Sequence, residues 1–456
     1  MGWISSSDAC GAGSREVCWL VRQLPLQKWS LSVKLKGYGR FFKEGFWIVL
    51  GQVMMVTGSL VGVRLLTELL SPSSYGELAL GMTIATLVNQ TILGPLGGGV
   101  TRFYAPAIEY GDLSGYMNAA RKLVSYAIGL IALIATFSAV GLTIAGEIKW
   151  VTISTIALLF AALGGCNAIL SGIQSAARQR AIVALHQGGD PWLRSLVGAG
   201  LLLWLGATST VAMIGYAFAT ILVLGSQVFF FMKIIASNIV NASGEKNWEN
   251  EIWEFSWPIG IWGIFTWMQL TSDRWALQIF STTHEVGNYA VLYQLGFYPI
   301  SLITGMVMQF LIPILYQRAG DASDSTRVNS VNKFSWYLTW TTLALTGLIF
   351  VVALLFHALI FKFLVAEKYN SLSYLLPWMT LTGGVFASGQ SLASSLLAQM
   401  KTREMMVATI VTALFGVALN FIGAYWYGVI GIVGSGVLFS ILYFICMVVL
   451  VKGANR

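Results

Sequence analysis

Twelve long apolar stretches run along this chain and constrain what it can fold into. Their approximate centres are residues 57, 87, 133, 161, 197, 221, 264, 301, 346, 385, 414 and 440. Each is near the ~20 residues that a helix needs to cross a bilayer. Lipid leaves backbone groups no outside partner, and the ~10-residue alternating strands of a barrel are absent. With 56% hydrophobic and 10% charged residues, the chain is predicted to be an all-α integral membrane protein with about twelve transmembrane helices.

Lysine and arginine are concentrated on one side of the predicted topology. The net charge is +8, and if the amino terminus lies in the cytoplasm, 21 of the 27 Lys and Arg residues fall in cytoplasmic segments. Positive residues are retained on that side during membrane insertion. The distribution therefore predicts a multi-pass protein of the cytoplasmic membrane with both termini inside. It argues against nucleic acid as a partner.

The predicted spans fall into two sets of six. The N-lobe covers 44–233 and the C-lobe covers 253–456, including a short C-terminal tail, and a polar cytoplasmic linker at 234–252 joins them. Residues 1–43 lack the continuous apolar core of a signal peptide. We expect them to be a disordered cytoplasmic tail; the alternative is an upstream start codon, with the working protein beginning near Val33.

A pattern of polar residues occurs once in each predicted half. The first copy comprises Arg64, Ser71, Tyr75-Gly76 and Gly111-Asp112, and the second comprises Arg274, Ser281, Val286-Gly287, Tyr289 and Gly320-Asp321. The Arg-to-Ser spacing is seven in both copies, and the Arg-to-Asp spacing is 48 in the first and 47 in the second. An even number of spans per half makes the copies parallel repeats. Such repeats are typical of transporters with a cleft between their halves.

Three stretches of the chain carry a family resemblance: RLLTELLSPSSYGELAL at 64–80, TRFYAPAIEYGD at 101–112 and SDRWALQIFSTTHEVGNYAVLYQL at 272–295. They resemble the Wzx-like polysaccharide-transporter branch of the MOP flippase superfamily, which also contains MurJ and the MATE exporters. The resemblance implies a V-shaped pair of six-helix bundles. It also implies alternating-access transport of a lipid-linked glycan, an undecaprenyl-diphosphate oligosaccharide, for polysaccharide export. The implied partners are this glycan, membrane lipids, and glycan polymerase or export machinery.

Arg64 and Arg274 stand near the outer ends of the first and seventh spans. A charge inside a span costs ~2.5–3.5 kcal/mol on insertion scales, so it usually faces a polar cavity. We expect the two arginines to face each other across the cleft, with Asp273 beside Arg274, and to bind a diphosphate bidentately. The alternative is that each arginine reaches the outer headgroups or pairs locally.

His186, Asp190 and Arg194 are spaced four apart in the fifth span and so share one helix face. Pro191 removes a backbone donor there and favours a kink. A broken, charged span is typical of transporter binding sites, so we predict that Arg194 and Asp190 contact the substrate. His186 and Asp190 are candidates for proton coupling. The alternative for His186 is a place among the cytoplasmic headgroups.

Uncharged polar residues lie inside other spans, at Asn89, Gln90, Gln269 and Asn420. Each is a candidate for binding sugar hydroxyls in the cleft. The alternative is hydrogen bonding between neighbouring helices, which also places such residues inside membranes.

The sequence lacks the motifs of several other functions. It has no Gly-rich loop ending in Lys-Ser/Thr for ATP, no His-Glu-x-x-His for zinc and no Gly-x-Ser-x-Gly elbow. We therefore expect no cofactor, no metal and no catalysis. A MATE-like ion-coupled exporter should carry an acid deep in the first or seventh span, whereas Glu44 and Asp273 stand at span ends. That exporter and a lipid II flippase are the alternatives to an oligosaccharide flippase.

Overall fold

The computed structural model describes residues 31–238, 246–319, 325–399 and 401–453. The chain divides into two compact units, residues 1–47 and 48–456, and the arrangement below is that of the second. Most of the predicted tail lies outside the described residues, as do Gly320-Asp321 and the middle of the predicted linker.

The described residues are almost entirely helical, and no strand occurs among them. The helices are α2 (Leu31–Leu69), α3 (Pro72–Val88), the π-helix η1 (Asn89–Leu93), α4 (Gly94–Glu109), α5 (Leu113–Ile144), α6 (Ile148–Ala176), α7 (Arg180–Leu205), α8 (Ser209–Asn238), α9 (Trp248–Phe280), α10 (Thr283–Ala319), α11 (Ser325–Leu364), the 3-10 helix η2 (Glu367–Leu375), α12 (Leu376–Ala398) and α13 (Thr402–Gly453). The first helix begins before the predicted start of the first span. Elements α3, η1 and α4 together form one continuous span.

Helix α13 contains the last two spans as antiparallel arms. Gly428 has φ +55°, in the left-handed region that glycine adopts at no steric cost, and the chain reverses there. A Cβ on either Gly423 or Gly431 would run into the backbone of the other. Ser435 Oγ donates to Leu419 O at 2.7 Å across the same arms.

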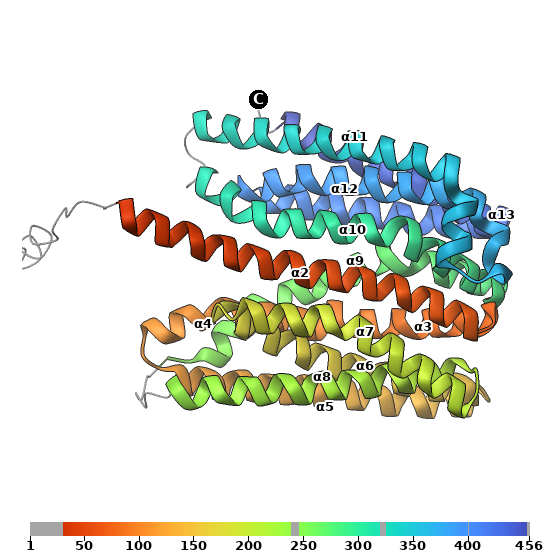
Figure 1. The fold of residues 1–456 in the computed structure, drawn as a ribbon, viewed down its shortest axis with the longest axis horizontal. Helices are drawn as coiled ribbons and strands as arrows, with labels where there is room; N and C mark the ends of the chain where they lie inside the picture. Colours follow the sequence, from red (N-terminus) through yellow and green to blue (C-terminus); the bar gives the residue numbers. More distant parts are fainter. Residues whose placement is uncertain (1–30, 239–245, 320–324, 400, 454–456) are drawn as a thin grey trace, which may run out of the picture. The chain divides into compact units, whose positions relative to one another are not determined.

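Successive spans run in opposite directions, so the turns between them gather at two ends (Figure 1). We call the end with the turns near residues 70, 146, 207, 281 and 366 the Leu70 end. The opposite end, with turns near 111, 178 and 400, is the Asp112 end. By length and composition alone, seven helical segments among the described residues could cross a membrane.

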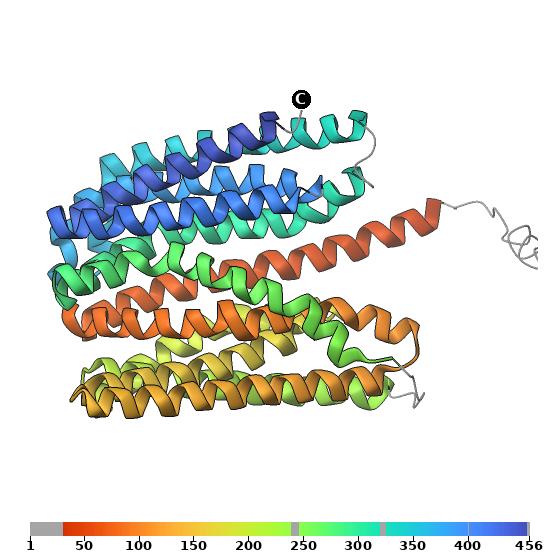
Figure 2. The same ribbon diagram turned by 180° about the vertical axis from the view of Figure 1, so that it is seen from behind.

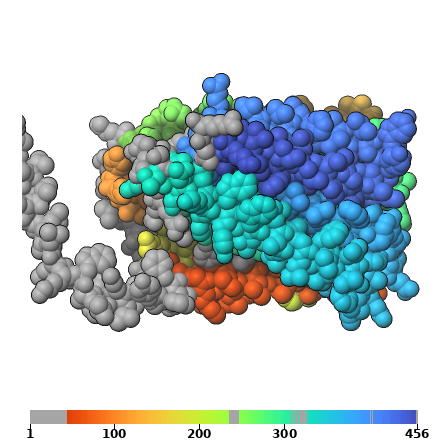
Figure 3. Space-filling view, turned by 90° about the horizontal axis from the view of Figure 1, so that it is seen from above, coloured from red at the N-terminus to blue at the C-terminus, as the bar shows by residue number. Residues whose placement is uncertain are grey.

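Apolar side chains cover the outward faces of the helices. Figure 3 shows α11 and α13 on one face of the molecule. Leu355 of α11 and Val449 of α13 are 69% and 62% exposed. Large exposed apolar residues in this number are typical of a lipid-facing surface. The packing that positions the site therefore lies between helices rather than on this surface.

The spans form two bundles, which we call the N-bundle (residues 48–238) and the C-bundle (α9–α13). In the N-bundle, Gly51, Gly58 and Gly62 let α2 approach α7 closely. One apolar core includes buried residues of both bundles, among them Leu70 and Leu277. The bundles are thus joined by packing and not only by the linker.

Helices α3 and α10 cross through two glycines near the Leu70 end. A Cβ on Gly76 would run into the carbonyl of Thr283, and a Cβ on Gly287 would run into the carbonyl of Pro72. In each helix the contacted carbonyl stands four residues before the glycine, so the contact is reciprocal. The two glycines of the sequence repeat therefore meet, and backbones can approach so closely only where a side chain is absent.

Helix α9 packs on both bundles. Its C-terminal half contacts α13, and its N-terminal half contacts α4, α5 and η1; Figure 2 shows it running obliquely between the bundles. Pro258 lies inside the helix. Gly260 and Gly263 have no Cβ, and this leaves room for the backbone carbonyls of Thr91 and Gln90 in the π-helix. The seventh span begins at Trp248. Its N-terminal half packs against the N-bundle, although the sequence places this span in the C-lobe.

Candidate functional site

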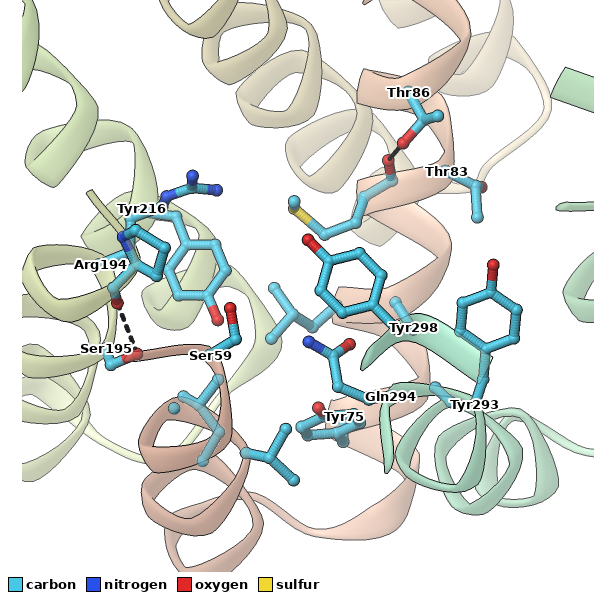
Figure 4. A pocket seen from close by; sticks show the side chains of 18 of the residues that line it. Ser59, Tyr75, Thr83, Thr86, Arg194, Ser195, Tyr216, Tyr293, Gln294 and Tyr298 are labelled. Atoms are coloured by element: carbon cyan, nitrogen blue, oxygen red, sulfur yellow. Dashed lines mark hydrogen bonds between the residues drawn. The ribbon is translucent and has the colours of Figure 1, made fainter. Parts of the chain in front are cut away.

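A cavity of about 780 Å³ lies between the two bundles and is lined by residues of α2, α3, α7, α8, α9 and α10. Its charged lining residues are Asp190, Arg194 and Arg274. Figure 4 shows Arg194 and Tyr216 on one side and Tyr293, Gln294 and Tyr298 of α10 on the other. A volume of this size suits a small-molecule head group.

Arg274 is held firmly at the C-bundle wall of the cavity. Its Nη1 donates to Leu270 O at 3.1 Å and lies 3.4 Å from Asp273 Oδ1. Its guanidinium carbon lies 4.2 Å from the ring centre of Tyr293, which is within cation–π distance. Asp273 also accepts from Arg274 N at 2.7 Å and from Tyr289 Oη at 2.6 Å. These contacts fix the direction of the guanidinium.

Arg194 lies on the N-bundle wall and forms an ion pair with Asp190, one helical turn earlier. Its guanidinium carbon is 5.5 Å from the ring centre of Phe160. Its Nε is buried without a hydrogen-bond partner, so the guanidinium retains an unused donor. Few buried polar atoms in folded proteins stay unpaired, and this one lies in a cavity-lining side chain.

Close packing of α7 against α2 places the Asp190–Arg194 pair. Trp192 Nε1 donates to Met54 O at 2.8 Å, and the Trp192 ring occupies the space that a Cβ on Gly58 would need. Ser195 Oγ donates to Pro191 O at 2.7 Å, which satisfies a carbonyl beside the predicted break. Helix α7 nevertheless continues through Pro191.

Hydrogen bonds at the Leu70 end join α2 and the residue after it to the segment around η2. Arg64 donates to Val365 O, Ala366 N donates to Thr67 Oγ1 at 3.2 Å, and Tyr369 Oη donates to Leu70 O at 3.0 Å. A phenol is protonated at neutral pH and can donate, and burial raises the pKa of Tyr369 further.

Three predicted charged residues lie outside the cavity lining. Arg64 donates to Val365 O and pairs with Glu68 at 3.2 Å, so it does not face Arg274 across a cleft. Asp273 lies behind Arg274. His186 contacts Ile182 O at 2.8 Å and Ser226 Oγ at 3.0 Å, which turns its ring toward α8 rather than toward Asp190.

The four predicted uncharged residues also lie outside the lining. Asn89 donates to Ala85 O of α3 at 3.1 Å within its own span, and Asn420 donates to Ser272 Oγ at 2.9 Å between α13 and α9. Gln90 presents its backbone carbonyl to Gly263. The Nε2 of Gln269 is buried without a partner. The geometry of Asn420 matches the interhelical alternative.

Sequence reasoning missed the tyrosines and the glutamines that line the cavity. They are Gln52, Tyr75, Gln187, Tyr216, Tyr293, Gln294 and Tyr298. A signal existed in the eighth span, where Tyr293, Gln294, Tyr298 and Ser301 form a polar stripe in an apolar segment. Among the described residues, no group of three or more His, Cys, Asp or Glu could hold a metal ion.

The fold of this chain also occurs in solved structures. The lipid II flippase MurJ in an inward closed conformation matches with a TM-score of 0.64 and 14% identity, over 90% of this chain and 87% of that chain. The Vibrio cholerae MATE transporter VcmN matches with 0.63 and 16%, over 91% and 95%. A MOP superfamily transporter from Pyrococcus furiosus matches with 0.57 and 13%, over 90% and 96%. At these identities the likeness establishes the fold alone.

The chain thus has the fold of these MOP superfamily structures. Residues 41–318 match the model of the polysaccharide biosynthesis protein family, and no match was found among curated proteins. Because the family match spans more than half of the chain, the protein belongs to the polysaccharide biosynthesis protein family. The prediction of an all-α membrane protein with twelve helices in two bundles is confirmed.

Proposed function

We propose that the protein is a flippase that moves polyprenyl-diphosphate-linked oligosaccharides across the cytoplasmic membrane. The proposal rests on the observation that Arg194 of the N-bundle and Arg274 of the C-bundle line the same cavity. Family membership favours a polysaccharide precursor as cargo. MurJ, which has the same fold, is a lipid II flippase.

The diphosphate is the part of the substrate that the arginines would bind. Guanidinium groups bind phosphate oxygens bidentately through parallel N–H donors. Arg274 is oriented by Asp273 and Tyr293, and Arg194 has an unused Nε donor. The phenols and the amide on α10 supply hydrogen-bonding groups for sugars, while the polyprenyl tail stays in the lipid.

In this proposal the Asp112 end faces the cytoplasm, where both termini lie. Lys and Arg residues gather there, at Arg102, Arg121, Lys122, Arg178, Arg180 and Lys233, as expected for a cytoplasmic face. Bonds between α2 and the η2 segment join the bundles at the opposite end, so we infer that this state takes substrate from the cytoplasmic leaflet. Rocking of one bundle against the other would then turn the cavity outward.

Complementation of a flippase-null strain tests the proposal. Surface glycan should return with the wild-type chain and fall at least tenfold with Arg194→Ala or Arg274→Ala, because a charged hydrogen bond contributes about 1.5–3 kcal/mol. Lys362→Ala is the matched control, since it removes an exposed cation at the end of α11. Membrane levels of each variant are measured by immunoblot. Full activity of both arginine variants at normal levels would overturn the cavity assignment.

Both substrates carry a diphosphate, so the arginine variants cannot distinguish a glycan flippase from a lipid II flippase, and a second strain is needed. A strain depleted of its lipid II flippase is complemented in parallel. Growth rescue there, without surface glycan in the first strain, would assign peptidoglycan precursor as the cargo and reject the polysaccharide substrate.

A further inference from the structure

The cavity carries less net positive charge than its two arginines suggest. Its charged lining residues are Arg194, Arg274 and Asp190, and Asp273 pairs with Arg274 directly behind the lining. Two positive and two negative side chains therefore lie in or beside the described cavity. A diphosphate bound between the arginines would have two carboxylates as neighbours.

The two carboxylates differ in the hydrogen bonds that each would keep if its paired arginine turned toward a phosphate. Asp273 would keep the backbone N–H of Arg274 at 2.7 Å and the Tyr289 hydroxyl at 2.6 Å. For the Asp190 side chain, the ion pair with Arg194 is the one ion pair or hydrogen bond among the described residues. Loss of that pair would leave Asp190 as an uncompensated carboxylate in a partly buried site, which is unfavourable.

Among the described residues, no other free cation faces Asp190 from the surrounding elements. Arg274 of α9 is held by Asp273, and His186, one turn earlier on α7, is bonded to Ile182 and Ser226. The remaining neighbours in the lining are neutral at physiological pH: Gln52, Met55 and Ser59 of α2, Tyr75 of α3, Gln187 of α7, Tyr216 of α8, and Tyr293, Gln294 and Tyr298 of α10. A proton is the simplest cation to replace Arg194, since it needs no shell of further ligands.

We propose that Asp190 is an internal counter-ion that takes up one proton from solvent when an anionic diphosphate binds Arg194. Without substrate, Asp190 neutralises Arg194. With substrate, the phosphate takes the guanidinium, and protonation of a carboxylate oxygen of Asp190 changes the net charge of the four side chains from zero to +1. Substrate binding and proton binding at this site then strengthen each other, as linkage requires. This inference rests on the proposed diphosphate site.

Calorimetric titration of the full-length protein in detergent tests the proposal, with geranylgeranyl diphosphate as the probe. Titrations in two buffers of different ionisation enthalpy count the protons taken up per diphosphate bound. Asp190→Asn measures the probe's own protonation changes in the same buffers. Relative to this variant, we expect the wild type to take up about one additional proton. Its affinity should rise up to about tenfold for each unit by which the pH falls.

Two further variants separate this role from a structural one. Asp190→Glu keeps an ionisable counter-ion and should restore the additional proton, whereas Arg194→Gln should weaken binding at least tenfold. Melting temperatures show whether each variant is folded. Binding by the wild type with no more proton uptake than Asp190→Asn would overturn the counter-ion while leaving the diphosphate site intact. No binding by the wild type at any pH would overturn the proposed diphosphate site and the counter-ion with it.

Discussion

Two glutamates near the Leu70 end form ion pairs that differ in burial, and so in their expected contribution to stability. Glu77 is 9% exposed; it pairs with Lys149 and accepts from Ser209 Oγ at 2.6 Å. Glu68 pairs with Arg64 at 3.2 Å, but its side chain is 61% exposed. Solvent screens the second pair, whereas the first links α3 to the beginnings of α6 and α8.

We predict that Glu77→Ala lowers the free energy of unfolding by about 1–3 kcal/mol, because Ser209 is buried and would lose its acceptor. Glu68→Ala should lower it by at most about 1 kcal/mol, as expected of an exposed pair. Chemical unfolding of the purified protein in detergent, followed by tryptophan fluorescence, compares the two. Equal losses would show that the Glu77 network contributes no more than a surface pair.

At the residue scale, the sequence predicts a cavity position for both Arg194 and Arg274, but on different grounds. It also predicts that Arg64 faces the cleft, whereas the structure places Arg64 outside the cavity lining. Arg194 and Asp190 are four residues apart on one helix, and such spacing determines that they meet. Arg64 and Arg274 were linked by their positions in a repeat, which fixes their depth but not the neighbour that each faces. Only the packing of α2 against the η2 segment decides that Arg64 bonds to Val365 O.

At the element scale, the crossing of α3 and α10 depends on glycine in a way that most helix contacts do not. Each glycine faces a backbone carbonyl of the other helix. A flexible side chain could move aside, but a carbonyl within a helix can move only with its helix.

We predict that Gly287→Ala separates α3 from α10, destabilises the protein by about 1–3 kcal/mol as overpacking does, and reduces surface glycan in the complementation assay. Gly76→Ala should act alike, because its Cβ would meet the Thr283 carbonyl. Gly129→Ala is the matched control, since no atom lies within 4 Å of a Cβ there and alanine favours a helix. Thermal melting and surface glycan are measured for all three. A normal melting temperature and normal glycan for Gly287→Ala would show that the crossing can adapt.

The number of spans followed from the sequence, but the path of α9 did not. Apolar length specifies that a segment crosses the membrane, and here it predicted twelve crossings. It does not specify which bundle a segment touches along its course. Pro258, Gly260 and Gly263 are visible in the sequence, yet their effect depends on meeting the π-helix η1, a long-range contact. The cavity tyrosines were missed for the same reason, because several helices must be placed before an interior exists.

At the scale of the whole bundle unit, the Leu70 end is joined by polar bonds from α2 to the η2 segment, and α9 packs on both bundles. An alternating-access cycle must break the first set of contacts. The bond between Ala366 N and Thr67 Oγ1 at 3.2 Å marks two positions close enough for a direct test.

We predict that Thr67→Cys with Ala366→Cys, in a chain lacking its four native cysteines, forms a disulfide under mild oxidation and reduces surface glycan more than tenfold. Reduction should restore transport. A protease site inserted in the linker at 234–252 reveals the cross-link, because the two cleaved halves then stay joined. Each single cysteine variant serves as the control for oxidation. Transport that continues in fully cross-linked protein would show that the Leu70 end need not open.

The reciprocal contact of Gly76 and Gly287 has the geometry of an isologous interface, in which one surface patch meets its own copy. A homodimer of a single six-helix chain would make this contact twice with one glycine codon. Both halves of the present chain keep that glycine, whereas Arg64 and Arg274 have acquired different surroundings. Duplication and fusion of a gene for such a chain would produce this pair of glycines. The shared contact would then constrain both halves together, while residues away from it could change in each half separately.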